Sequence, residues 1–280
     1  MPVSIEAFWL MVWQKGSGVV LALNKLFEGG QRKGDVYWPT HTPTVKYGLM
    51  TIALVNTATD GDVTIRQLTI HNASTSEAPR KVFHISYSGW PDCGVPETTS
   101  CIREVAFLLF ALQQYANFEN ECDGPPVIHC SAGVGRTGCF VSLHYILKSG
   151  LFWNIEFLSD LSRILKNEVE DVDSSADLSL IHALSVFKIS DIVISLRQQR
   201  NPVTVQTAKQ FEFIFQAIRD EILTPTSLDK VEKFILSFLQ PLPDYTSAFP
   251  LLPNAWKSCR SQAQNSHPPI LPTPTTLTDN

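Results

Sequence analysis

One stretch decides the fold of this chain: Val127-Ile128-His129-Cys130-Ser131-Ala132-Gly133-Val134-Gly135-Arg136-Thr137-Gly138-Cys139-Phe140. Its apolar start predicts a short buried strand, and the apolar-rich residues 137–147 predict a helix. The loop between them contains two glycines, which tolerate unusual backbone dihedral angles and let successive N–H groups point at one place. The helix adds its own free N–H groups and the positive end of its dipole. The sequence therefore predicts an anion-binding cup with the thiol of Cys130 at its base.

The residue types in this cup indicate phosphoryl transfer. A free thiol has a pKa of about 8.5, and the amides, the helix end and Arg136 can together lower it. A guanidinium fork can hold two oxygens of a tetrahedral dianion while a thiolate attacks phosphorus. The cup itself supplies the positive charge, so this chemistry needs no metal. The competing interpretation is a buried structural cysteine followed by a chance arginine, and the many residue types at fixed offsets weigh against it.

Residues 129–138 (HCSAGVGRTG) resemble the active-site signature of the classical (non-receptor type) protein tyrosine phosphatases. The resemblance extends to residues 8–13, 37–39, 90–96 and 206–210, which occur in the family's order. It implies an α/β fold, in which helices flank a central twisted mixed sheet and a strand, an anion loop and a helix form the active site. It also implies hydrolysis of phosphotyrosine in proteins through a cysteinyl-phosphate intermediate, with no cofactor.

The resemblance implies the roles of the residues that match the family's motifs. Cys130 is expected to be the nucleophile, and Arg136 the phosphate clamp. Asp92 is expected to be the general acid, on a mobile loop marked by Trp90. Thr137 would assist Cys130 during hydrolysis of the thiophosphate. The rest of the cup would bind phosphate through Ser131, Ala132, Gly133, Val134 and Gly135.

Five further residues gain expected supporting roles from the same resemblance, although each also has an ordinary structural interpretation. Without the resemblance, His129 is interpreted as a core histidine, Glu28 and Lys33 as surface charges, and the two glutamines as polar residues at the start of a helix. In the family, the residue that matches His129 orients the thiolate and tunes its pKa. The match to Glu28 holds the arginine that corresponds to Arg136, and the match to Lys33 contacts the aspartate that corresponds to Asp92. The matches to Gln206 and Gln210 position the attacking water.

The remaining pattern predicts the scaffold. Apolar spacing predicts helices at residues 4–13, with Ser4 as the cap, and at 102–115. Alternating or continuous apolar runs predict strands at 19–23, 47–55, 63–71 and 80–87. A helix around 192–196 would end at Asn201-Pro202, and Gln206 and Gln210 would open the next helix. A short helix is also indicated at 228–239.

These elements predict one catalytic domain over residues 1–223, followed by a Pro-rich, disordered tail over 224–280. An insertion is expected at about 149–189, where an acidic cluster interrupts the family's usual spacing. The resemblance starts after the family's early strands and its substrate-recognition tyrosine. The catalytic domain is therefore expected to be truncated at its N-terminus, which would affect substrate selection and folding.

The composition of the chain argues against nucleic-acid-binding and membrane-spanning proteins. The 280 residues are 44% hydrophobic, enough for a sizeable core, and the net charge of −5 gives no basic surface for nucleic acid. No apolar run reaches the length of a membrane span. The six cysteines lack paired spacing, which favours a reducing compartment, the cytoplasm or alternatively the nucleus. The expected partner is a phosphotyrosine-containing protein substrate, and the oligomeric state is left open.

Two alternatives to an active tyrosine phosphatase stay open at this stage. A non-catalytic phosphotyrosine-binding or regulatory pseudophosphatase would fit a truncated domain, but the presence of Cys130, Arg136 and Asp92 together favours the enzyme. A dual-specificity phosphatase with a shallow cleft would also use the cup. Glu28 and Gln206-Thr207 favour the tyrosine-specific type.

Overall fold

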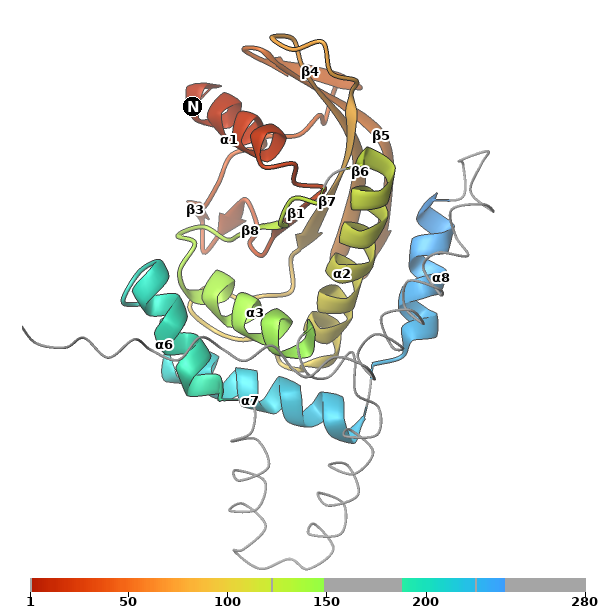
Figure 1. Ribbon diagram of the computed structural model, residues 1–280. Helices are drawn as coiled ribbons and strands as arrows, with labels where there is room; N and C mark the ends of the chain where they lie inside the picture. Colours follow the sequence, from red (N-terminus) through yellow and green to blue (C-terminus); the bar gives the residue numbers. More distant parts are fainter. Residues whose placement is uncertain (1, 122, 149–187, 225, 240–280) are drawn as a thin grey trace, which may run out of the picture.

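A central sheet organises the computed structural model of this chain, which describes residues 2–121, 123–148, 188–224 and 226–239 (Figure 1). Six strands run in the order β4-β5-β6-β7-β1-β8. The first four are antiparallel neighbours, whereas β1 pairs in parallel with both β7 and β8. The sheet strands are β1 Val19–Ala22, β4 Thr44–Tyr47, β5 Met50–Asp60, β6 Val63–Asn72, β7 Arg80–Tyr87 and β8 Val127–His129. The predicted α/β fold with a mixed sheet is confirmed.

Helices cover both faces of the sheet, because alternate residues along a strand point to opposite sides. Val20 packs in the core beneath α1, whereas Val19 and Leu21 pack in the core on the other face. β1 is thus buried throughout, as expected for a central strand with parallel neighbours. The helices are α1 Pro2–Gln14, α2 Ser100–Asn120, α3 Gly135–Ile146, α6 Ile189–Gln199, α7 Ala208–Leu223 and α8 Leu228–Leu239. On the second face, α2, α3 and α8 contact the sheet, whereas α6 and α7 pack against α3.

Three predicted boundaries are wrong for local reasons. The strand expected from residue 47 is two strands, because Gly48, with φ +57°, turns the chain between β4 and β5. The first helix begins at Pro2, a residue that suits a first turn, so Ser4 lies within the helix rather than capping it. Gln206 precedes α7, because the hydroxyl of Thr207 accepts from the Gln210 N–H and caps the helix.

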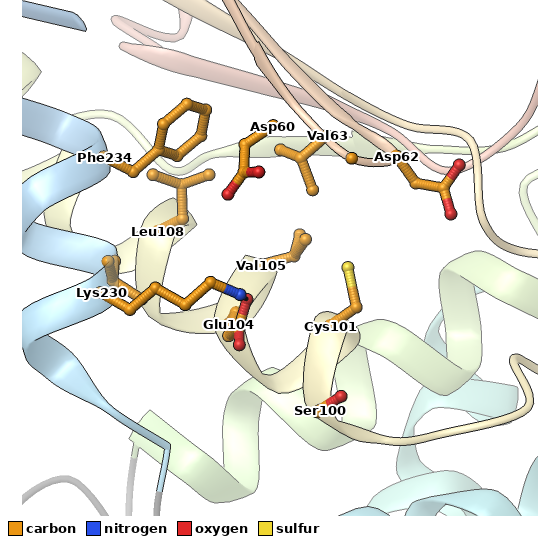
Figure 2. Close-up of a pocket in the computed structure, with 12 residues that line it drawn as sticks. Asp60, Asp62, Val63, Ser100, Cys101, Glu104, Val105, Leu108, Lys230 and Phe234 are labelled. Atoms are coloured by element: carbon orange, nitrogen blue, oxygen red, sulfur yellow. Dashed lines mark hydrogen bonds and ion pairs between the residues drawn. The ribbon is translucent and has the colours of Figure 1, made fainter. Parts of the chain in front are cut away.

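Helix α8 confirms the short helix indicated at residues 228–239, and this part of the predicted 224–280 tail packs against the core. Val231, Ile235 and Phe238 are buried in the core, and the Asn56 side-chain amide donates to the Phe238 carbonyl at 2.7 Å. Figure 2 shows the groove between α8, α2 and the β5–β6 turn, with Lys230 pointing toward Glu104. Residues 228–239 contain no proline, and their apolar spacing gives a helix one face to bury. The predicted insertion, except its end at 188–189, and residues 240–280 of the predicted tail lie outside the described residues.

Candidate active site

The loop from Cys130 to Val134 connects the end of β8 to the start of α3. Gly133 adopts a φ of +69°, and its N–H donates to the Cys130 sulfur at 3.2 Å. At Gly135, a Cβ atom would lie 2.9 Å from the amide nitrogen of Gln210, so a side chain there would collide with the glutamine. The two glycines therefore serve different ends: one permits the left-handed turn, and the other permits close approach of a neighbouring element.

The environment of the Cys130 sulfur favours the thiolate. Burial alone would raise the pKa of this thiol, but the hydroxyl and amide of Thr137, the amide of Gly133 and the charge of Arg136 outweigh it and hold the pKa below its usual value. The Thr137 hydroxyl is buried and has no other hydrogen-bond partner in the described part of the chain. Its proton is therefore available to the sulfur.

Arg136 is held in the first turn of α3 by a forked ion pair. Its two terminal nitrogens lie 2.6 Å and 3.0 Å from the two carboxylate oxygens of Glu28, which belongs to the hairpin of β2 (Phe27–Glu28) and β3 (Gln31–Arg32). One of them also donates to the Trp90 carbonyl at 3.3 Å. Both side chains of the pair are buried, at 4% and 8% exposure. The guanidinium is thus fixed in plane and direction before any ligand arrives.

Asp92 lies on the loop between β7 and α2, across from the cup. Its carboxylate contacts the Lys33 ammonium at 2.8 Å and the Arg136 guanidinium at 3.3 Å. The hydrogen bond from Lys33 is the main cause of a lowered pKa of Asp92. Trp90 is 1% exposed, and its indole N–H donates to the Gly94 carbonyl at 2.9 Å, so it anchors the loop that carries Asp92.

The two glutamines of the sequence motif reach the same loop, Gln210 from the first turn of α7 and Gln206 from the segment just before it. Gln210 is 1% exposed, and its side-chain oxygen accepts from the Gln206 N–H at 2.9 Å. A Cβ on Gly135 would lie 3.2 Å from the side-chain oxygen of Gln206. On the opposite rim, the Ser131 hydroxyl donates to the Lys33 carbonyl at 3.0 Å. All of the predicted site residues therefore lie on this loop or on the segments around it.

Sequence reasoning missed the support behind the loop. His129 contacts the Cys130 carbonyl through Nδ1, at 3.1 Å. Its other ring nitrogen lies 2.6 Å from the Tyr37 hydroxyl, which lies 2.7 Å from Nε2 of His84. Neither Tyr37 nor His84 was assigned a role from the sequence. The available signal was a histidine in the middle of an otherwise apolar run of β7.

The described residues include no group of three or more His, Cys, Asp and Glu side chains placed to hold a metal ion. Within the same residues, no helix combines the length and the apolar character needed to cross a membrane.

Comparison with known proteins gives one family. The family described as Protein-tyrosine phosphatase matches residues 1–154. Tyrosine-protein phosphatase 3 of Dictyostelium discoideum is 33% identical over 220 residues, which are 79% of this chain and 19% of that protein. The human receptor-type tyrosine-protein phosphatase eta is 32% identical over 221 residues, 79% of this chain and 14% of that protein. Corkscrew of Drosophila melanogaster is 26% identical over 231 residues, 82% of this chain and 24% of that protein.

The chain thus spans about a quarter or less of the length of these three relatives. The family match covers more than half of the chain. On that extent of similarity, this chain belongs to the protein-tyrosine phosphatase family.

Proposed function

We propose that this chain hydrolyses phosphotyrosine in proteins by passing the phosphoryl group first to Cys130 and then to water. The observation that carries the proposal is the convergence of three groups at one loop. The Cys130 thiol has a lowered pKa, the Arg136 fork is fixed by Glu28, and the Asp92 carboxylate lies 3.3 Å from that fork. A nucleophile, an anion clamp and a proton donor are the parts that such a reaction needs.

In the first step, the Cys130 thiolate attacks phosphorus, and the bond between phosphorus and the tyrosine oxygen breaks. The amides of the loop and Arg136 bind the phosphoryl oxygens, on which negative charge is concentrated. Tyrosine has a pKa of about 10, so its oxygen leaves more readily when it takes a proton. Asp92 donates that proton, which requires the neutral carboxylic acid in the complex. A bound dianion favours this form, because its charge opposes that of a carboxylate.

In the second step, water attacks the phosphorus of the cysteinyl phosphate, and the bond to sulfur breaks. Asp92, now a carboxylate, accepts a proton from the water. We assign the orientation of that water to Gln206 and Gln210, because their side chains approach Gly135 in the cup. Thr137 donates its hydroxyl hydrogen bond to the departing thiolate. Phosphate leaves, and Cys130 returns to its initial state.

The alternatives weighed from the sequence are less well supported. A binding-only protein would gain nothing from a depressed thiol pKa, since binding a phosphate dianion beside a thiolate costs electrostatic repulsion. The relatives reported above are named tyrosine phosphatases, which favours phosphotyrosine as the substrate. The four described cysteines, Cys93, Cys101, Cys130 and Cys139, are free, which favours a reducing compartment such as the cytoplasm.

The test is hydrolysis of a phosphotyrosine peptide in the presence of a chelator. We expect Cys130→Ser to abolish turnover, whereas Cys101→Ser, a matched change on α2, leaves it within about twofold of the original rate, as for surface changes away from a site. Asp92→Asn should lower kcat by about 10²- to 10⁴-fold, the usual contribution of a general acid. Chelator-sensitive activity that survives Cys130→Ser would refute the proposal.

A further inference from the structure

A line of polar side chains, with the buried His84 at its centre and the others partly buried, crosses the sheet behind the active-site loop, on the face covered by α1. Arg66 on β6 and His84 on β7 are cross-strand partners, and Nη1 of Arg66 lies 3.4 Å from Nδ1 of His84. Tyr37 fills the space between His84 and His129, with contacts of 2.7 Å and 2.6 Å from its hydroxyl oxygen. His129 continues the line to the Cys130 carbonyl at 3.1 Å.

The chemistry of the two ends fixes the direction of every hydrogen bond in this line. A carbonyl oxygen only accepts, so Nδ1 of His129 carries a proton; in a neutral ring, Nε2 then accepts from the Tyr37 hydroxyl. That hydroxyl has a single proton, so its oxygen accepts from Nε2–H of His84. Nδ1 of His84 is left as an acceptor, and Arg66 only donates. Each contact thus pairs one donor with one acceptor.

Both rings are neutral, as this direction requires. Burial lowers the pKa of His84 well below its usual value, and the charges of Arg66 and His129 act in the same sense. Burial also lowers the pKa of His129, against the opposing effect of its bond to the Cys130 carbonyl. The titratable groups that face His84 are Arg66 from β6, Tyr37 and His129.

Arg66 is held in place by groups outside the line. Its Nη1 donates to the Ser86 hydroxyl at 2.9 Å, and its guanidinium lies 4.7 Å from the centre of the Trp38 ring. The Trp38 ring in turn lies against His84, with 4.5 Å between the ring centres. The positive end of the line is therefore fixed on the sheet and not on the loop that carries Asp92.

We propose that Arg66 and His84 are positioning residues for the reaction, which act through Tyr37 to hold His129 as a donor to the Cys130 carbonyl. This inference rests on the proposed function. A peptide group whose carbonyl accepts a hydrogen bond becomes a stronger N–H donor, and a chain of such bonds reinforces itself. The peptide that carries the Cys130 carbonyl also carries the Ser131 N–H of the cup. The line from Arg66 thereby strengthens the cup's hold on the thiolate and on phosphate.

The decisive variants are His84→Phe and Arg66→Met, which remove one donor each, and His84→Gln, which keeps both a donor and an acceptor. The thiol pKa is measured from the pH dependence of alkylation of Cys130 by iodoacetamide. We expect the first two variants to raise this pKa by about half a unit to one unit, the weight of one lost hydrogen bond, and His84→Gln to restore most of the shift. The groups around the sulfur, Arg136, Thr137, Lys33, Asp92 and Glu28, are unchanged in all of them.

Val82→Ala is the matched control, because Val82 is buried on the same face of β7 but has no polar side-chain atom that could join the line. It should lower the melting temperature without changing the thiol pKa. Nitrogen-15 spectra of the histidine rings provide a readout that a packing role would not affect. We expect a protonated Nδ1 in His129 and a protonated Nε2 in His84, and loss of this pattern in Arg66→Met.

The opposite tautomers, or a thiol pKa that is the same in Arg66→Met, His84→Phe and the original protein, would overturn the inference. Alkylation and ring spectra need no turnover. If the protein fails to hydrolyse phosphotyrosine but the thiol pKa still shifts in the variants, the proposed function fails and the positioning role stands. If it hydrolyses phosphotyrosine and the pKa does not shift, only the positioning role fails.

Discussion

Two regions of the molecule bury an arginine–glutamate pair, and the pairs differ in what else surrounds them. At the candidate active site, Arg136 and Glu28 are 4% and 8% exposed and 2.6 Å apart. Between α2 and the end of α7, Arg103 and Glu221 are 7% and 5% exposed, also 2.6 Å apart. The chemistry of the two pairs is the same, and so is the cost of bringing two charges out of water.

The second pair is closed off from solvent by the surrounding protein, although the buried Nε of Arg103 has no hydrogen-bond partner in the described part of the chain. Arg103 also donates to the Thr224 carbonyl at 2.9 Å, and Glu221 accepts from the Thr226 hydroxyl at 2.6 Å. The first pair is open on one side, where Arg136 contacts the 39%-exposed Asp92. The difference teaches that a buried ion pair can serve stability or ligand binding, according to whether protein encloses it or leaves its arginine facing an exposed site.

Replacing each arginine by lysine gives the largest expected contrast. We expect Arg136→Lys to lower kcat/KM for a phosphotyrosine peptide by about 10³-fold, because a lysine keeps the charge but cannot hold two oxygens in one plane. Arg103→Lys should leave kcat/KM within about threefold, because its pair does not face the cup; only stability is at stake there. Equal losses of activity in the two variants would show that the Arg103 pair also belongs to the catalytic machinery.

Replacing each glutamate by alanine should distinguish the two pairs by how strongly a phosphate anion stabilises the variant. Glu221→Ala leaves Arg103 buried without its counter-charge, and we expect a loss of about 3–5 kcal/mol of unfolding free energy. Glu28→Ala should also destabilise the fold, but there a bound phosphate can replace the lost charge. Inorganic phosphate in a thermal melt should therefore restore more stability to Glu28→Ala than to Glu221→Ala. If phosphate stabilises both variants equally, the Arg136–Glu28 pair is not more open to an anion than the Arg103–Glu221 pair.

The sequence predicted the open pair better than the closed one. Glu28, Arg136 and Asp92 are far apart in the chain, but Arg136 and Asp92 lie in motifs, and the family resemblance implies the contact of Glu28 with Arg136. Arg103 and Glu221 occupy helical positions with no motif, so their pairing depends on how α2 and α7 pack. Long-range packing of this kind leaves no local signal, because helix periodicity specifies a buried face but not the partner on it.

The absence of a local signal for long-range packing also explains which helices, strands and supporting residues are predicted poorly from the sequence. Strand β7 was predicted at its observed bounds, because its apolar run is long and bounded by turn signals. The apolar spacing of residues 228–239 predicts helix α8 at its observed bounds, whereas the surrounding prolines, which dominate the composition, hide its packing against the core. His84 was overlooked for a related reason: a single polar residue in a buried strand acquires meaning only when Tyr37 is seen beside it.

Lys33→Met tests the open side of the active-site pair through pH. Lys33 lowers the pKa of Asp92, chiefly by its hydrogen bond. Without it, Asp92 keeps its proton to a higher pH, so the basic limb of the kcat/KM profile, which reports loss of the general acid's proton, should move upward. The acidic limb should move little, because the Cys130 thiolate is stabilised mainly by Thr137 and Gly133. A downward shift of the basic limb would show that this limb belongs to another group.

The smallest expected effect comes from a third ion pair, which lies on the surface. Lys230 on α8 contacts Glu104 on α2 at 2.7 Å, with side-chain exposures of 57% and 28%. Water screens such a pair, so Lys230→Met should cost at most about 1 kcal/mol of unfolding free energy, and less in high salt. Phe238→Ala is the matched change on α8, and because Phe238 is 1% exposed it should cost about 3–5 kcal/mol. Denaturant melts of the two variants measure the difference. If Lys230→Met costs as much as Phe238→Ala, α8 is held by its charges and not by its apolar face. Solvent exposure would then fail to predict that the Lys230–Glu104 pair contributes less to stability than the two buried pairs.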